Sequence, residues 1–172
     1  MSIKFKTSIL DRLLIYLPLL LLFISVFNEF DFNYFNYKYF SFNFPFILIF
    51  YWSLKRIESL GYGYIFIAGL FNDAVIGFPI GISSLTYLII CGFAAYLRNI
   101  TLRPSLFKDW LYFLFTILVA NSINYFLLVT FFLIELNYYE LTGNIIFTFL
   151  FYYIFGYLFD IYQRLAFGKK ND

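Results

Sequence analysis

One acidic residue, Asp73, lies inside an apolar stretch of the chain, and a turn rich in glycine and proline follows it. Within residues 65–76 the only other strongly polar residue is Asn72. A charged side chain at membrane depth costs about 2.5 to 3.5 kcal/mol on insertion scales, so such a residue usually marks a functional position. The chain has no histidine and a single cysteine, Cys91, which removes the commonest metal ligand and general base. We therefore predict hydrogen-bonding chemistry at Asp73, and no enzyme, metal site or cofactor.

A second apolar stretch contains three polar residues, Asn121, Ser122 and Asn124. Asp73 and Asn121 lie twelve and eleven residues into their segments, which is about 16 to 18 Å along a helix. Polar groups at the same depth in hydrocarbon are expected to pair with one another. The sequence thus predicts a polar cluster in which Asp73 bonds to Asn121 or Asn124, with Asn72 and Ser122 as neighbours. The alternative is that these residues only hold helices together.

The elements that position these residues are predicted to be membrane-spanning helices. The chain of 172 residues is 63% hydrophobic and 13% charged, whereas soluble domains carry about 25% charged residues. A spanning helix needs about 20 mostly apolar residues. We predict an all-α protein with one domain, residues 1–172, whose six spans cover residues 13–27, 39–54, 61–76, 82–97, 110–134 and 144–167.

The basic residues alternate between the connections of this six-span arrangement. Of the 12 Lys and Arg residues, all except Lys38 lie before the first span, in the second and fourth connections, or at the C-terminal end of the chain, where Arg164 falls in the last turn of the sixth span. Positively charged connections face the cytoplasm, so we expect both termini there. The inner connections would form a cytoplasmic basic face that contacts protein or anionic headgroups; it consists of Lys55, Arg56, Arg98, Arg103 and Lys108.

The third and fourth spans are joined by a short apolar turn, residues 77–81, that contains two glycines and Pro79. Glycine permits left-handed backbone and proline removes a donor, so a tight turn is expected. The next span begins with the small polar residues Ser83, Ser84 and Thr86. Small residues let helices approach closely, and we expect this segment to pack tightly against a neighbour.

The spacing Gly69-x-x-x-Asp73-x-x-x-Gly77-x-Pro79-x-Gly81 resembles the signature of the bacterial rod shape-determining protein MreD family. Chain length, the number of spans and the basic inner connections are similar to that family along the whole chain. The resemblance implies a fold similar to the six-helix substrate-binding subunits of energy-coupling-factor vitamin transporters. Two departures are the high Phe and Tyr content and the polar Asn72, where many relatives have an apolar residue.

The resemblance also implies a role in regulating cell shape. The protein would be a non-enzymatic scaffold of the cell-elongation machinery (the elongasome) in the bacterial inner membrane, with no nucleic-acid partner. Its expected partners are an MreC-like bitopic protein, an MreB-like actin homologue and the synthases of peptidoglycan. Packing and docking roles would fall on the five motif residues, Gly69, Asp73, Gly77, Pro79 and Gly81.

A second hypothesis is a substrate-binding membrane subunit of a small-molecule (vitamin) transporter. In that case Asp73, Asn121 and Asn124 would line a pocket at the membrane midplane that is open to the outside. Neighbouring genes would discriminate the two hypotheses: a bitopic coiled-coil protein and an actin homologue favour the scaffold, whereas an ATPase pair and a coupling protein favour the transporter.

Overall fold

The computed structural model describes residues 9–27, 41–56, 59–101, 105–134 and 137–167, and within them every regular element is an α-helix. This confirms the all-helical fold. The helices of the described part are α1 (Ile9–Phe27), α2 (Phe44–Lys55), α3 (Tyr62–Ile76), α4 (Ile82–Ile100), α5 (Leu106–Phe132) and α6 (Tyr138–Phe167). Each overlaps one predicted segment. The largest differences are at α2, which begins five residues later, and α6, which begins six residues earlier.

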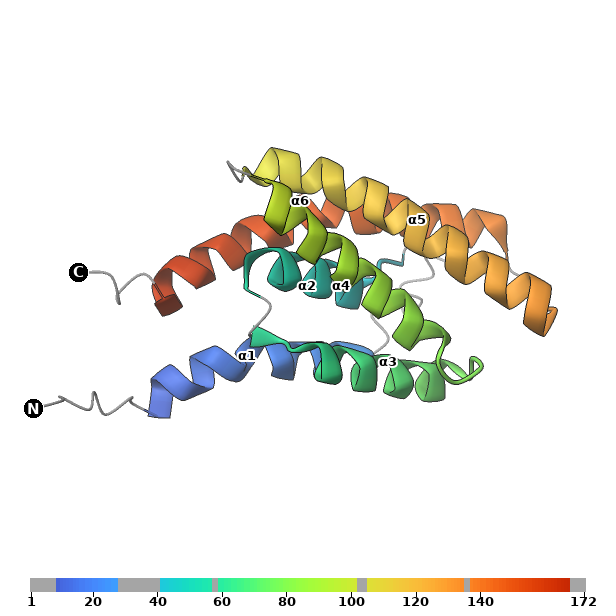
Figure 1. The fold of residues 1–172 in the computed structure, drawn as a ribbon, viewed down its shortest axis with the longest axis horizontal. Coiled ribbons are helices and arrows are strands. Elements are labelled where there is room, and N and C mark those ends of the chain that lie inside the picture. The colour runs from blue at the N-terminus through green and yellow to red at the C-terminus, as the bar shows by residue number, and fades with distance from the viewer. Residues whose placement is uncertain (1–8, 28–40, 57–58, 102–104, 135–136, 168–172) are drawn as a thin grey trace, which may run out of the picture.

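The helices form three pairs that pack on one another. Helices α2 and α4 lie between the α1–α3 pair and the α5–α6 pair (Figure 1). Successive helices run in opposite directions, so α1 begins and α6 ends at the same end of the bundle (Figure 1). The α3–α4 turn lies at the opposite end, together with the start of α2 and of α6.

Helix α2 forms the centre of the core. Every residue from Phe44 to Leu54 is buried, as expected for a helix that is apolar on all sides. Its Phe50 ring lies against Phe113 of α5 and Tyr152 of α6, with ring centroids 5.1 and 5.6 Å away. At 12 residues the helix is about 18 Å long, shorter than a hydrocarbon layer of about 30 Å. Because its neighbours surround it, α2 contacts little outside the bundle.

The outward faces of the other helices are apolar. On α3, for example, Phe66, Phe71 and Val75 are exposed while Ala68 and Asp73 are buried. This arrangement is the reverse of a water-soluble bundle, whose outer face is polar. Among the described residues, two helical segments, Leu106–Phe132 and Tyr138–Leu165, are long and apolar enough to cross a membrane.

Candidate functional site

Helices α3 and α4 are joined by a turn whose backbone requires glycine. Gly77 ends α3 in the left-handed conformation, with φ of 79°, and its N–H donates to the carbonyl oxygen of Asp73 at 2.9 Å. Gly81 precedes α4 with φ of 107° and ψ of −15°. A side chain at either position would strain the backbone. Pro79 lies between them, and its carbonyl accepts from the N–H of Ile82.

The side chain of Asp73 caps the N-terminus of α4. One carboxylate oxygen accepts from the N–H of Gly81 at 2.7 Å, and the other accepts from the N–H of Ser83 at 2.9 Å. Gly81 holds the N-cap position of α4 but has no side chain to cap it, so Asp73 supplies the missing oxygen from the neighbouring helix. The first N–H groups of a helix have no intrahelical partner, and its N-terminus favours negative charge. These backbone donors explain how the fully buried acid is accommodated, although no basic side chain among the described residues forms an ion pair with it.

The predicted hydrogen bond between Asp73 and Asn121 or Asn124 is wrong. Both carboxylate oxygens of Asp73 are engaged by α4, and the amide of Asn121 donates to the carbonyl of Ile117 in its own helix at 2.9 Å. Equal depth along two helices does not make their side chains face each other. The N-terminus of α4 lies closer to Asp73 along the chain and offers two donors.

Gly69 lies where α3 and α4 approach most closely. A Cβ atom at this position would be 2.4 Å from the Cα atom of Ser84, which is well inside van der Waals contact. The hydroxyl of Ser84 donates to the carbonyl of Phe66 at 2.9 Å, and the amide of Asn72 donates to the hydroxyl of Ser83 at 2.9 Å. The small polar residues at the start of α4 therefore pack closely against α3, as expected.

The five motif residues thus belong to a single structural unit, the α3–α4 hairpin. Gly69 permits the close approach, Asp73 caps α4, and the Gly77, Pro79 and Gly81 segment forms the turn. Asp73 is fully buried, so it cannot contact a partner directly. The chemical role of these residues is to hold α3 and α4 in one fixed relative position.

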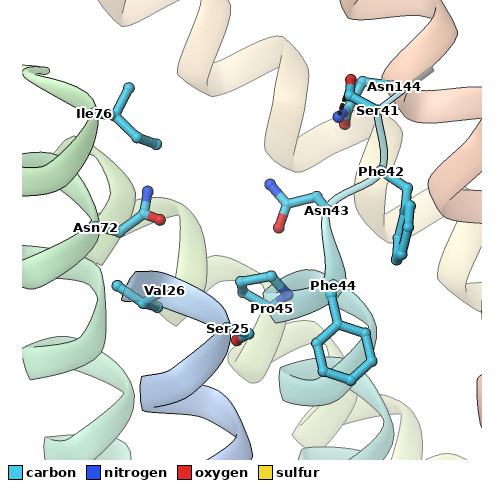
Figure 2. Close-up of a pocket in the computed structure, with 10 residues that line it drawn as sticks. All are labelled: Ser25, Val26, Ser41, Phe42, Asn43, Phe44, Pro45, Asn72, Ile76 and Asn144. Carbon is cyan, nitrogen blue, oxygen red and sulfur yellow. Dashed lines mark hydrogen bonds between the residues drawn. The ribbon is translucent and has the colours of Figure 1, made fainter. Parts of the chain in front are cut away.

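A cavity of about 250 Å³ lies beside this hairpin, between α1, α3, the start of α2 and the start of α6. In Figure 2 the side chains of Asn43 and Asn72 approach each other across it, and Asn144 is bonded to Ser41 at one side. The remaining described lining is mainly apolar and includes Phe42, Phe44, Pro45 and Ile76.

A second cavity of about 280 Å³ adjoins the first and shares Ser41, Asn43 and Asn144 with it. Its other walls include Asn121 and Asn124 of α5. The structure therefore places Asn72 on one chamber and Asn121 and Asn124 on the other. Ser122 is exposed on α5 and lines neither.

The predicted basic face is only partly available for docking. Lys55 pairs with the buried Asp109 at 2.7 Å, which ties α2 to α5, and the lysine side chain is 19% exposed. Arg98 and Lys108 are exposed, and Arg56 is half-buried. Arg103 lies outside the described residues.

Sequence reasoning missed several residues of this site. Asn43 and Asn144 on the cavity walls were not predicted, although each leaves a signal in the sequence, and neither was Asp109, the partner of Lys55. Asn43 is the N-cap of α2, where its side chain accepts from the N–H of Phe46 at 3.3 Å, and an asparagine two residues before a proline is a recognisable helix start. Asn144 is an isolated amide in an apolar helix.

Comparison with known proteins leaves the family undetermined. The chain matches no protein-family model, no curated protein and no solved structure.

Proposed function

We propose that this protein is a non-enzymatic, multi-pass scaffold of the bacterial cell-elongation machinery, similar to the MreD family. The observation that carries the proposal is the α3–α4 hairpin, in which all five residues of the signature act in one structural unit. A rigid hairpin with an apolar outer face is suited to docking the transmembrane helix of another protein.

The proposed topology has six spans, with both termini in the cytoplasm of a bacterial inner membrane. Among the described cationic side chains, Lys55, Arg56, Arg98, Lys108 and Arg164 belong to helix ends on one side of the bundle, the side where α1 begins and α6 ends (Figure 1). Basic residues on one side favour the cytoplasm for that side. The apolar outer faces of α3 and α5 favour contact with lipid.

The proposed partners follow from these surfaces. An MreC-like bitopic protein and peptidoglycan synthases would dock by helices within the membrane. Exposed Arg98 and Lys108 would face an MreB-like actin homologue or anionic headgroups at the cytoplasmic surface.

The test is an Asp73→Ala replacement in a rod-shaped bacterium that depends on this gene for its shape. We expect the cells to become round and the MreC-like partner to be lost from, or misassembled in, complexes purified from membranes. Gly63→Ala is the control, because Gly63 lies near the start of α3, away from the turn, and an added Cβ atom there meets nothing within 4 Å, and it should leave both readouts unchanged. Rod-shaped cells with normal complexes in Asp73→Ala, at equal protein level, would exclude Asp73 from the mechanism.

A second candidate is the substrate-binding subunit of a small-molecule transporter. It is favoured by one observation: Asn121 and Asn124 line a cavity. Against it, the third expected pocket residue, Asp73, is buried against α4.

Purifying the protein from its own membranes separates the two candidates. A bitopic coiled-coil protein and an actin homologue would support the scaffold, whereas a pair of ATPases with a coupling protein would support transport. Genes for these same proteins next to the gene of this chain would discriminate between the two candidates equally well.

A further inference from the structure

The two adjoining chambers lie at the end of the bundle opposite to the one where α1 begins and α6 ends. Six asparagines from four parts of the chain line them: Asn43, Asn72, the pair Asn121 and Asn124 on α5, and the pair Asn137 and Asn144. Together the chambers reach the size of ordinary small-molecule sites, about 300 to 1,000 Å³. Concave sites with mostly apolar walls and a few convergent polar groups are typical of ligand binding.

Several of these carboxamides have hydrogen-bonding capacity that the described residues do not use. The Oδ1 atom of Asn124 is buried and has no hydrogen-bond partner. Asn72 and Asn121 each use only the amide nitrogen, towards Ser83 and Ile117, and Asn43 uses only its side-chain oxygen. Each carboxamide could form two or more further bonds. A buried polar atom without a partner destabilises the folded protein, so a ligand that completes these bonds would be bound favourably.

The charges on the chamber walls restrict the ligand. No lysine or arginine is among the described lining residues, and the one acid, Glu140, is exposed and accepts from the amide of Asn137 at 3.0 Å. On the described walls an anion would meet no compensating cation, which is costly in a partly buried site. The unused side-chain atoms include the oxygens of Asn72, Asn121 and Asn124, which need donors, and the nitrogen of Asn43, which needs an acceptor. Aromatic walls from Phe78 and Tyr125 would cover the apolar face of a small ring.

We propose that the two chambers form a binding site for a small, uncharged molecule rich in hydroxyl and amide groups. Asn72 and Asn43 contact it in the first chamber, and Asn121 and Asn124 contact it in the second. The assignment rests on the cavity alone and goes beyond the scaffold function, so its failure would leave that function untouched.

The test measures binding to the full-length protein in nanodiscs by saturation-transfer NMR and calorimetry. Three uncharged probes are used: N-acetylglucosamine, myo-inositol and nicotinamide. N-acetylneuraminic acid, which carries a carboxylate, is the anionic comparison. We expect saturable binding of at least one uncharged probe and none of the anion. Asn124→Leu and Asn72→Leu should each weaken that binding at least tenfold, because each removes the polar end that faces a chamber.

Asn99→Leu is the matched control, because Asn99 is exposed at the far end of α4, and its affinity should equal that of the wild type. Asn121→Leu is a second variant of the same chamber, since the Asn121 amide bonds only within its own helix and its loss should leave the fold intact. Helical content from circular dichroism identifies any variant that fails to fold. Absence of saturable binding to all three uncharged probes overturns the proposal. So does unchanged affinity in the folded chamber variants, or preferential binding of the anion.

Discussion

Asp73 is the residue whose environment most changes the interpretation of this chain. An acid in an apolar segment suggests a membrane-embedded site that reacts or binds. Its two oxygens instead accept from backbone N–H groups at 2.7 and 2.9 Å. The helix N-terminus provides the compensation that a basic side chain provides elsewhere. The role of the residue is therefore to order the α3–α4 turn, and any effect on function passes through that turn.

Replacing Asp73 should destabilise the protein in proportion to the acceptors that are lost. Asp73→Ala leaves two N–H groups without their partner, and we expect a loss of about 2 kcal/mol in unfolding free energy. Asp73→Asn keeps one acceptor and should lose less. Unfolding by denaturing detergent, followed by circular dichroism, gives both values. Equal stability of the alanine variant and wild type would show that the cap contributes nothing.

At the scale of elements, the α3–α4 pair is specified by small residues at matching positions. Gly69 meets Ser84 with no room for a Cβ atom, and two interhelical hydrogen bonds, Ser84 to Phe66 and Asn72 to Ser83, lie on either side of this contact. Close backbone approach increases van der Waals contact, which drives helix association where lipid removes the hydrophobic contribution. The hairpin therefore places the whole signature on one interface.

Two glycines of α3 offer a matched test of this contact. Gly69→Ala should cost about 1 to 3 kcal/mol, because the new methyl group would force the α4 backbone away. Gly63→Ala meets nothing within 4 Å and should be neutral or stabilising by up to about 1 kcal/mol, since alanine is the better helix former. Thermal unfolding of both variants in the same detergent measures the difference. A Gly69→Ala protein as stable as Gly63→Ala would contradict the observed helix approach.

At the scale of the whole molecule, polarity is distributed inside out. Large apolar side chains cover the outer faces of α3, α5 and α6, while buried polar groups link helices: Tyr51 to Asp160, Lys55 to Asp109 and Asp73 to α4. Pairing within the bundle avoids the cost of a polar group in hydrocarbon. The same distribution would expose an unfavourable apolar surface in water, which supports the proposed location in a membrane.

The proposed orientation predicts which side chains a membrane-impermeant maleimide reaches. Cys91 is fully buried and should give little background. Glu140→Cys should be labelled in intact cells, whereas Lys108→Cys should be labelled only after permeabilisation, because both positions are exposed in the fold and only the membrane separates them. Labelling of Lys108→Cys in intact cells would reverse the orientation.

The sequence by itself determined the all-helical fold. Long apolar runs must satisfy their backbone hydrogen bonds locally, and in such segments only a helix does so. The glycines and proline of residues 77–81 likewise determined a tight turn, because few other residues adopt those backbone angles.

Only the tertiary structure decided which groups meet. Hydropathy and depth place Asp73 and Asn121 at one level, but they carry no information on the rotation and tilt of each helix. Those depend on side-chain packing, such as Gly69 against Ser84. For the same reason the sequence could place Asn121 and Asn124 on a pocket only as one hypothesis, and it could not show that Asn43 and Asn144 complete the walls, because these walls come from segments up to about a hundred residues apart.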